Sequence, residues 1–133
     1  MIEDGLFEHL SEAAAVAAIV GEGSDAAIFP VRMPDKQTKP AIVYRRISSP
    51  RESVSEGQTP VVRARFQIDL YGPDFDQLRV LANAVREAMV GFRGSMGGTT
   101  VQGCFLDNEA DDPVADDLKQ FHTRQDWLIW YEE

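Results

Sequence analysis

The feature of this sequence that most constrains its fold is the stretch from Val61 to Phe92, where a strand pattern leads directly into a helix pattern. Apolar residues first occupy every second position, which is typical of a strand with one buried face. These residues are Val62, Ala64, Phe66, Ile68 and Leu70. After Gly72 and Pro73 the apolar spacing becomes helical. The helical apolar positions are Phe75, Leu78, Ala82, Val85 and Met89. Each element has one apolar face, so the sequence predicts two layers that bury these faces against each other.

Other stretches predict a second helix and further strands. Residues 1–20 have helical apolar spacing and end at Gly21, a usual place for a left-handed cap. β-branched and aromatic residues predict three more strands. These strands span residues 40–47, 101–106 and 121–131. Residues 27–31 contain Pro30, which has no N–H for a ladder, so they form an edge strand at best. The last strand is apolar on both sides, which places it in the middle of the sheet or beneath a partner.

Two long polar connections complete the predicted fold. One spans residues 48–60, and the other spans residues 107–120 and is strongly acidic at its start. Connections of this length in a compact domain are usually mobile or functional. The sequence therefore predicts a single α+β domain over residues 1–133. We expect a two-layer sandwich in which a mainly antiparallel sheet of about four strands packs against two helices, with two long loops.

Composition narrows the classes of function. The formal net charge of −9 at pH 7 argues against sequence-independent binding to nucleic acid, because affinity for phosphate requires an excess of Lys and Arg. No stretch has the pattern of a transmembrane helix or of a secretion signal. The single cysteine, Cys104, lies in an apolar run and is predicted to be a buried, unreactive thiol. These features predict a soluble cytoplasmic protein that binds neither DNA nor membranes.

The sequence contains no motif that points to catalysis. His9 and His122 are its histidines, and neither accompanies a nucleophilic serine motif or zinc-ligand spacing. The glycine-rich run at 94–100 follows a helix and lacks the Lys-Ser/Thr ending of a phosphate-binding loop. The acidic run at 107–112 resembles the start of a calcium loop but lacks the required Gly and Glu at the sixth and twelfth positions. We therefore predict no enzymatic activity, no catalytic residues, no cofactor and no metal site.

Charges of opposite sign are concentrated in two different parts of the chain. The strands at 40–47 and from residue 61, with the connection between them, are predicted to form a hairpin. The charged residues on and around this hairpin are mostly basic and are candidates for a subunit interface. They are Arg45, Arg46, Arg51, Glu52, Arg63 and Arg65. The second predicted loop is acidic. Its carboxylates are Asp107, Glu109, Asp111, Asp112, Asp116 and Asp117. A basic hairpin that meets the acidic loop of the next subunit would give head-to-tail association, while an ordinary solvated sheet face is the alternative.

Taken in order, these segments resemble the tail completion, or head–tail joining, proteins of long-tailed bacteriophages and prophages. The strongest segment is Arg-Phe-Gln-Ile-Asp-Leu-Tyr at 65–71, which leads into the helix with Leu-Ala-Asn-Ala-Val-Arg at 81–86. The other segments lie at 28–31, 40–44, 47–48 and 125–131, after an amino-terminal helix with Leu6 and Leu10. The similarity covers nearly the whole chain, and the succession of segments is more specific than any one of them.

The resemblance implies a structural virion protein, similar in fold and role to tail terminators. Those proteins form a hexameric ring at the head-proximal end of the tail tube, where the ring stops polymerisation and docks onto the filled head. The implied partners are other copies of the chain, the tail tube protein and a head-completion or connector protein. The implied location is the virion, and the host cytoplasm during assembly. The acidic loop would lie in the lumen or at the subunit interface, and an acidic lumen would let DNA pass without specific binding.

A second class of function remains open from the residues alone. An α+β sandwich of this size could instead be a small soluble cytoplasmic ligand-binding protein, or an enzyme of unknown substrate, with its ligand in a cleft. The sequence has no convergent set of polar groups with catalytic spacing, and this favours the structural role.

Overall fold

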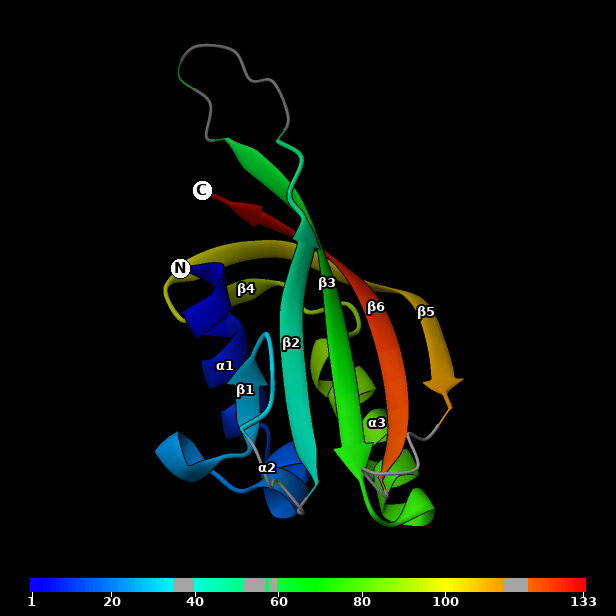
Figure 1. The fold of residues 1–133 in the computed structure, drawn as a ribbon. Helices are drawn as coiled ribbons and strands as arrows, with labels where there is room; N and C mark the ends of the chain where they lie inside the picture. The colour runs from blue at the N-terminus through cyan, green and yellow to red at the C-terminus, as the bar shows by residue number, and fades with distance from the viewer. Residues whose placement is uncertain (35–39, 52–56, 58–59, 114–119) are drawn as a thin grey trace.

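A computed structural model gives the fold of residues 1–34, 40–51, 57, 60–113 and 120–133 (Figure 1). In this part of the chain, one sheet of six strands packs against three α-helices. The helices are α1 (Ile2–Glu12), α2 (Ala14–Val20) and α3 (Phe75–Met89), with a short 3₁₀ helix η1 (Gly23–Asp25). The strands are β1 (Ile28–Pro30), β2 (Ala41–Ser48), β3 (Val61–Gly72), β4 (Gly94–Met96), β5 (Thr99–Asp112) and β6 (Phe121–Glu132).

The sheet is mixed, and its strand order is β1-β2-β3-β6-β5-β4. β1 pairs with β2 in parallel, and the other neighbours are antiparallel. The expectation of a sheet of about four strands against two helices is therefore wrong. β1 and β4 have three residues each, which is too short to display a periodicity of two. The central position predicted for the last strand is confirmed, because β6 lies between β3 and β5.

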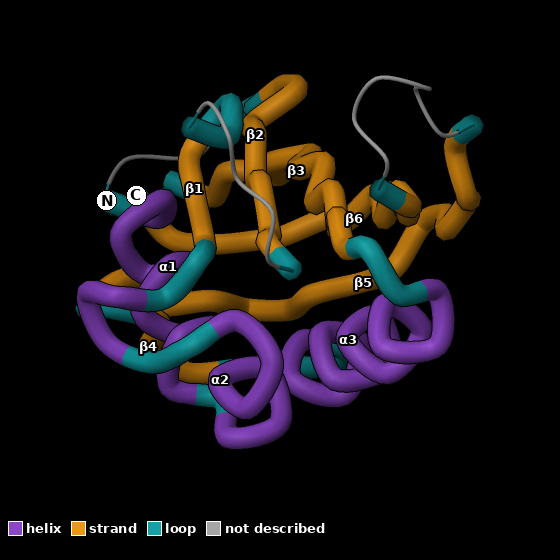
Figure 2. The backbone as a smooth tube through the Cα atoms, turned by 60° about the horizontal axis from the view of Figure 1, so that its bottom comes forward, coloured by secondary structure: helices purple, strands orange, loops and turns teal. Residues whose placement is uncertain are grey.

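The sheet curls into a half-barrel around the helices, which cover its inner face (Figure 2). α1 contacts both β1 and β4, although these strands lie at opposite ends of the strand order. The contact with β4 is made by backbone. A Cβ atom added to Gly5 would collide with the carbonyl oxygen of Met96, and one added to Gly97 would lie 2.5 Å from the Cα of Gly5. Glycine at both positions lets α1 close the half-barrel.

The helix predicted over residues 1–20 is two helices. The chain is extended at Ala13, with φ −70° and ψ 116°, and this residue caps α1 and begins α2. α1 buries Leu6 and Leu10 as predicted, but α2 turns Val16 and Val20 inward. The helical spacing of the sequence also places Ala13 and Ala17 on the apolar stripe, but this prediction is wrong, since both alanines are only partly buried. The predicted end of the helical region at Gly21 is confirmed, and its φ is +92°.

The core lies between the inner face of the sheet and the helices. All five alternating residues of β3 are buried, as predicted. α3 buries Leu78, Ala82, Val85 and Met89, but Phe75 is 43% exposed, so its assignment to the core is wrong. The largest fully buried side chain is Trp127 of β6. At the start of α3, the Oδ1 atom of Asp74 accepts a hydrogen bond from the backbone N–H of Gln77, as expected for an N-cap.

The acidic segment after residue 106 is not a loop over its first part. β5 continues to Asp112 and pairs with β6 along this length, with irregularities between Val101 and Gly103 and between Leu106 and Asn108. A strand that is polar on both faces shows no apolar alternation, which explains the wrong prediction. The other predicted loop begins after Ser48, and Arg51 then forms an isolated bridge with Val62. None of the described helices is long and apolar enough to cross a membrane.

Candidate functional site: the outer face of the sheet

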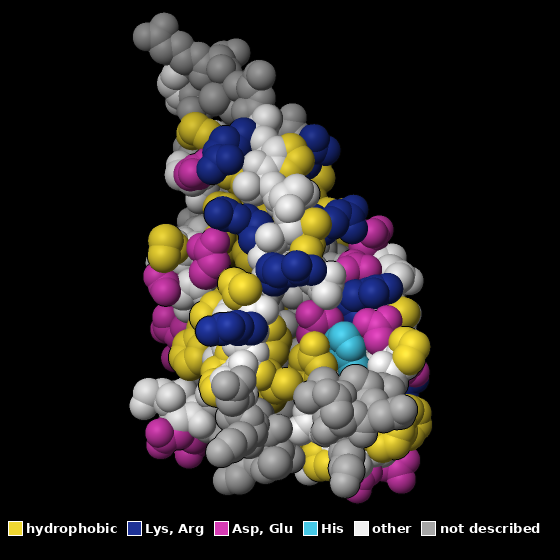
Figure 3. Space-filling model, viewed as in Figure 1, with side chains coloured by type: hydrophobic (Ala, Val, Ile, Leu, Met, Phe, Trp, Pro, Cys, Tyr) yellow, Lys and Arg dark blue, Asp and Glu magenta, His cyan; other side chains and the backbone are white. Residues whose placement is uncertain are grey.

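Five of the charged residues that the sequence singled out lie on the outer face of the sheet: Arg45, Arg63, Arg65, Asp107 and Asp112. Alternation along β3 turns Arg63, Arg65, Gln67 and Asp69 away from the core. Figure 3 shows this face, with Arg side chains gathered over β2 and β3. Cross-strand pairing then sets which side chains are neighbours, since β3 is hydrogen-bonded to β2 on one side and to β6 on the other.

Near the start of β3, the outer face holds a hollow of about 300 Å³ that we call the Trp130 hollow. Its lining residues are Ser48, Pro50, Arg63, Arg65, Leu128 and Trp130. The guanidinium carbon of Arg63 lies 5.5 Å from the centre of the Trp130 ring, a cation–π distance. Arg65 Nη1 lies 2.8 Å from Oδ2 of Asp107 on β5. The hollow therefore combines an aromatic floor with two guanidinium groups.

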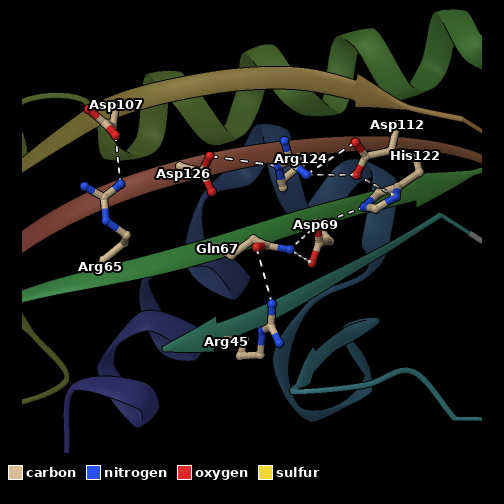
Figure 4. Close-up of polar contacts among 9 residues, drawn as sticks. All are labelled: Arg45, Arg65, Gln67, Asp69, Asp107, Asp112, His122, Arg124 and Asp126. Carbon is tan, nitrogen blue, oxygen red and sulfur yellow. Dashed lines mark hydrogen bonds and ion pairs between the residues drawn. The ribbon is translucent and has the colours of Figure 1, made fainter. Parts of the chain in front are cut away.

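Farther along the outer face, a chain of polar contacts crosses four strands (Figure 4). Arg45 on β2 donates to Oε1 of Gln67 at 3.4 Å, and the amide of Gln67 donates to both carboxylate oxygens of Asp69. Asp69 also lies 2.8 Å from Nε2 of His122 on β6. The other ring nitrogen of His122 is 3.4 Å from Oδ2 of Asp112 on β5. Both ring nitrogens of His122 thus face carboxylates.

This chain of contacts continues through Arg124, which lies 3.4 Å from Asp112 and 3.9 Å from Asp126. The ring of Tyr71 stacks on His122 at 4.3 Å. Burial, and then the negative charges of Asp69 and Asp112, raise the pKa of the Tyr71 hydroxyl. In this part of the face, basic and acidic side chains of the same molecule therefore contact one another.

The inner-face carboxylates of β5 pair with α3. Glu109 Oε1 lies 2.6 Å from Nη1 of Arg86, and Asp111 Oδ2 lies 3.0 Å from Nη2 of Arg79. Thr123 on β6 also donates to Asp111 at 2.8 Å. These contacts hold α3 against β5.

The arginines predicted for the subunit interface are divided between the two faces of the sheet. Arg45, Arg63 and Arg65 share the outer face, whereas Arg46 turns inward and lies 3.5 Å from Glu3 of α1. Arg51 forms two hydrogen bonds with Glu133. The hydrogen bond from Arg51 and its positive charge lower the pKa of the Glu133 carboxyl.

The sequence predicted that the carboxylates from residue 107 onward lie in a loop. The structure shows that those among the described residues pair with other side chains. Asp107, Glu109, Asp111 and Asp112 each contact a basic side chain from another element. Glu52, Asp116 and Asp117 lie outside the described residues. Their contribution to any contact stays a prediction.

Sequence reasoning missed a second acidic region, on α1. Asp4, Glu8 and Glu12 are exposed and recur at every fourth residue, so they share one face of the helix. The spacing was visible in the sequence. It was overlooked because the apolar stripe of the same helix gave the stronger pattern.

Cys104 and His9, the side chains elsewhere that could carry chemistry, have structural roles. Burial raises the pKa of the Cys104 thiol to about 12, so this side chain stays protonated and unreactive at neutral pH. His9 donates from Nε2 to the carbonyl oxygen of Ala88 at 2.7 Å and packs on Phe92. Among the described residues, no group of three His, Cys, Asp or Glu side chains is arranged to hold a metal ion.

Known proteins share the fold of this chain, and a family model matches its sequence. The fold is similar to that of a chain from the virion of a native gene transfer agent (GTA) particle, with a TM-score of 0.68 and 17% identity over 96% of this chain and 92% of that chain. No curated protein matches the sequence. The family model described as tail completion protein gp17 matches residues 4–132. The chain belongs to this family, which confirms the resemblance stated from the sequence. It is a structural, virion-associated phage tail protein and not an enzyme.

Proposed function

We propose that this protein forms a ring, hexameric as in tail terminators, at the head-proximal end of the tail. There it ends polymerisation of the tube and supplies the surface that joins tail to head. The observation that carries this proposal is membership in the tail completion family over residues 4–132. The likeness of the fold to a chain in a virion particle supports it.

The proposed ring requires contacts between copies of the chain and with two other proteins. We propose the tail tube protein and a head-completion or connector protein as the neighbours along the tail axis. Between copies, we propose that the interface includes Arg45, Arg46, Arg51, Glu52, Arg63 and Arg65. The net charge of −9 supports a channel through which DNA passes without specific binding, because phosphate is repelled by like charge.

The lumen or interface role of the acidic residues between positions 107 and 117 stays part of this proposal. The residues are Asp107, Glu109, Asp111, Asp112, Asp116 and Asp117. Reversing the charge of Asp111 also breaks its contacts with Arg79 and Thr123, so such a variant tests the proposed role only if its fold is intact. We expect reversal of Asp116 and Asp117 to lower particle yield.

Removal of the protein from the producing cell tests the function directly. We expect filled heads and separate tails to accumulate, with tails of uncontrolled length. Adding the purified protein to such an extract should restore joined particles. Particles of normal form and yield without the protein would contradict the proposal.

A further inference from the structure

The surface where β1 ends carries positive charge beside exposed apolar side chains. Val31 and Arg32 follow β1 directly, and Arg45 and Ile47 lie on β2 beyond the last residue that pairs with β1. Val31 is 66% exposed and Ile47 is 44% exposed. We call these four residues the β1-end surface. Large apolar side chains that stay exposed together are typical of interaction sites.

The backbone of Val31 is strained, and the strain keeps this surface open. Its φ of +70° is unfavourable for a β-branched residue. The N–H of Arg32 donates to the carbonyl of Pro30 at 2.8 Å, which closes a γ-turn of the rare, strained kind. The turn ends β1 after three residues, so β1 does not pair with β2 beyond Tyr44. Strained backbone of this kind is concentrated at functional segments of proteins.

The two arginines of the β1-end surface have no carboxylate partner in the described part of the chain. Arg32 takes part in no ion pair or side-chain hydrogen bond there, and Arg45 donates to the neutral side chain of Gln67 at 3.4 Å. They differ in this respect from Arg65, which pairs with Asp107 of its own chain. The positive charge of the β1-end surface is therefore open to a partner.

The outer side of α3 carries the opposite charge. Asp76, Val80, Asn83, Glu87 and the C-cap residue Val90 follow one another at spacings of three and four, so they share one side of the helix, and all five are exposed. We call them the α3 outer side. Within the described residues, neither of its two carboxylates takes part in an ion pair. The two valines are 58% and 57% exposed.

The two surfaces match in composition and lie on opposite sides of the molecule. Each carries two charges that the described ion pairs leave open and two exposed apolar side chains. Figure 2 shows β1 and β2 at the upper left and α3 at the lower right, with the rest of the sheet between them. The surfaces cannot meet within one molecule, but two copies can bring them together, and the same contact can then repeat from copy to copy.

The carboxylates of α1 suit the β1-end surface less well. Glu8 and Glu12 border a groove that Tyr44 also lines, and the carbonyl of Tyr44 accepts the N–H of Val31 at 2.9 Å. The acidic side of α1 therefore lies next to the β1-end surface. Neighbouring surfaces of opposite charge would pair two copies about a two-fold axis, and such a pair does not extend into a ring.

We propose that the β1-end surface of one copy docks onto the α3 outer side of the next. This inference rests on the proposed ring and names the surfaces that join its subunits. Arg32 and Arg45 then face Asp76 and Glu87 across the contact, and the exposed apolar side chains of both surfaces are buried. Because the two surfaces differ, the contact is heterologous, and it closes into a ring when the rotation between copies allows.

Charge reversal on each side, followed by exchange of both sides, tests the proposal. The first variant is Arg32→Glu with Arg45→Glu, and the second is Asp76→Lys with Glu87→Lys. We expect each to reduce ring formation on purified tail tubes by about tenfold or more, because like charges then meet across the contact. The variant with all four substitutions restores opposite charges and should form rings again.

Two further variants test the apolar part of the contact without harm to the fold. Val31→Gly suits a φ of +70°, and Val80→Ala has the higher helix propensity, so neither should lower the melting temperature. We expect each to reduce ring formation by about threefold or more, because an apolar side chain is lost from the contact. A purely structural role for these valines would not weaken assembly while the stability is kept.

A matched control separates this contact from a general effect of charge. Glu8→Lys with Glu12→Lys makes the same change of net charge as the reversal on α3, and it should leave ring formation within about twofold of the wild type. Thermal melting of every variant checks that the fold is kept, as expected for exposed side chains.

The outcomes distinguish the inference from the proposed function. If the wild-type protein forms no ring on tail tubes, both are contradicted. If the wild type forms rings and either reversal leaves them intact, or the four-residue exchange fails to restore them, the docking inference alone is wrong. Rings lost in the α1 variant but kept in the α3 variant would assign the acidic side to α1 and would contradict it. Rings that persist while attachment to the tube is lost would assign the two surfaces to the tube protein and would also contradict it.

Discussion

At the scale of single residues, Gly5 is a position where an added side chain would meet backbone. It is buried in α1 against the backbone of the β4–β5 turn, where an added Cβ would collide with the carbonyl of Met96. We predict that Gly5→Ala lowers the free energy of unfolding by about 2 kcal/mol or more, since backbone must move to admit the methyl group.

Gly72→Ala is the control for this prediction. Gly72 is also buried, but the nearest atoms to an added Cβ are 3.8 Å away. We expect a change within about 1 kcal/mol. Urea denaturation of both variants measures the difference, and equal effects would show that the close approach of α1 to β4 does not limit stability.

Cys104 gives a prediction about pH. Burial raises the pKa of its thiol from 9.0 to about 12, so the unfolded chain loses this proton before the folded protein does. Above pH 9 the unfolded state then binds fewer protons, and stability falls as the pH rises towards 12. We predict that the stability difference between the wild type and Cys104→Ala shrinks between pH 8 and about 10.5, as measured by urea denaturation.

The comparison with Cys104→Ala is needed because Tyr44, Tyr71 and Tyr131 have raised pKa values and add a loss of stability in the same direction. The cavity left by the shorter side chain shifts the variant equally at every pH. A difference that stays constant over this range would contradict the assignment of a buried, neutral thiol.

At the scale of elements, a buried hydrogen-bond chain joins α3 to the sheet. Gln125 of β6 is fully buried, and its amide donates to the carbonyl of Ala82 at 3.2 Å and to Glu109 at 2.6 Å. Its own Oε1 accepts from the indole N–H of Trp127 at 3.1 Å. Glu109 in turn pairs with Arg86. One side chain therefore satisfies polar groups from α3, β5 and β6.

We predict that Gln125→Leu lowers the free energy of unfolding by about 1–3 kcal/mol, although it places an apolar residue of similar size in the core. The reason is that the indole N–H of Trp127 and the carbonyl of Ala82 lose a partner in a place without water. Gln102→Leu is the control, because Gln102 is exposed and its bond to Glu132 is 3.4 Å long. If Gln125→Leu leaves the free energy of unfolding unchanged, the buried hydrogen bonds of Gln125 contribute no net stability.

Elements with one apolar face were predictable from the sequence, and elements held by polar partners were not. The alternation in β3 and the helical spacing of α3 report burial directly, so both were confirmed. The acidic half of β5 is held by Arg79 and Arg86 of α3 and by residues of β6, which are distant in sequence. A pattern of neighbouring residues in the sequence does not reveal ion pairs between such distant positions.

The candidate site, likewise, could be predicted only in part from the sequence. The sequence indicated Arg63 and Arg65 as interface candidates, because their outward direction follows from the alternation of β3. The hollow beside them depends on Trp130 and Leu128, whose place opposite these arginines is fixed by the register between β3 and β6. The curl that sets α1 apart from this face depends on the glycine contact at Gly5, which periodicity does not reveal.

At the scale of the whole molecule, the pairing of charges explains how a chain with a net charge of −9 can still present distinct surfaces. The outer sheet face balances most of its charges internally, and the exposed carboxylates of α1 do not. If ion pairs form between copies, assembly should weaken as salt shortens the range of these charges from about 10 Å at 0.1 M to about 3 Å at 1 M. Light scattering across this range measures the effect, and assembly independent of salt would argue for a purely apolar contact.

Electron microscopy of tail tubes incubated with the purified protein is the decisive test of the proposed ring. We predict a closed ring of about six copies, seated at one end of each tube, and no further growth of tubes that carry it. A protein that stays monomeric and unbound at high concentration with tubes present, or tubes that continue to grow beneath it, would contradict the claim.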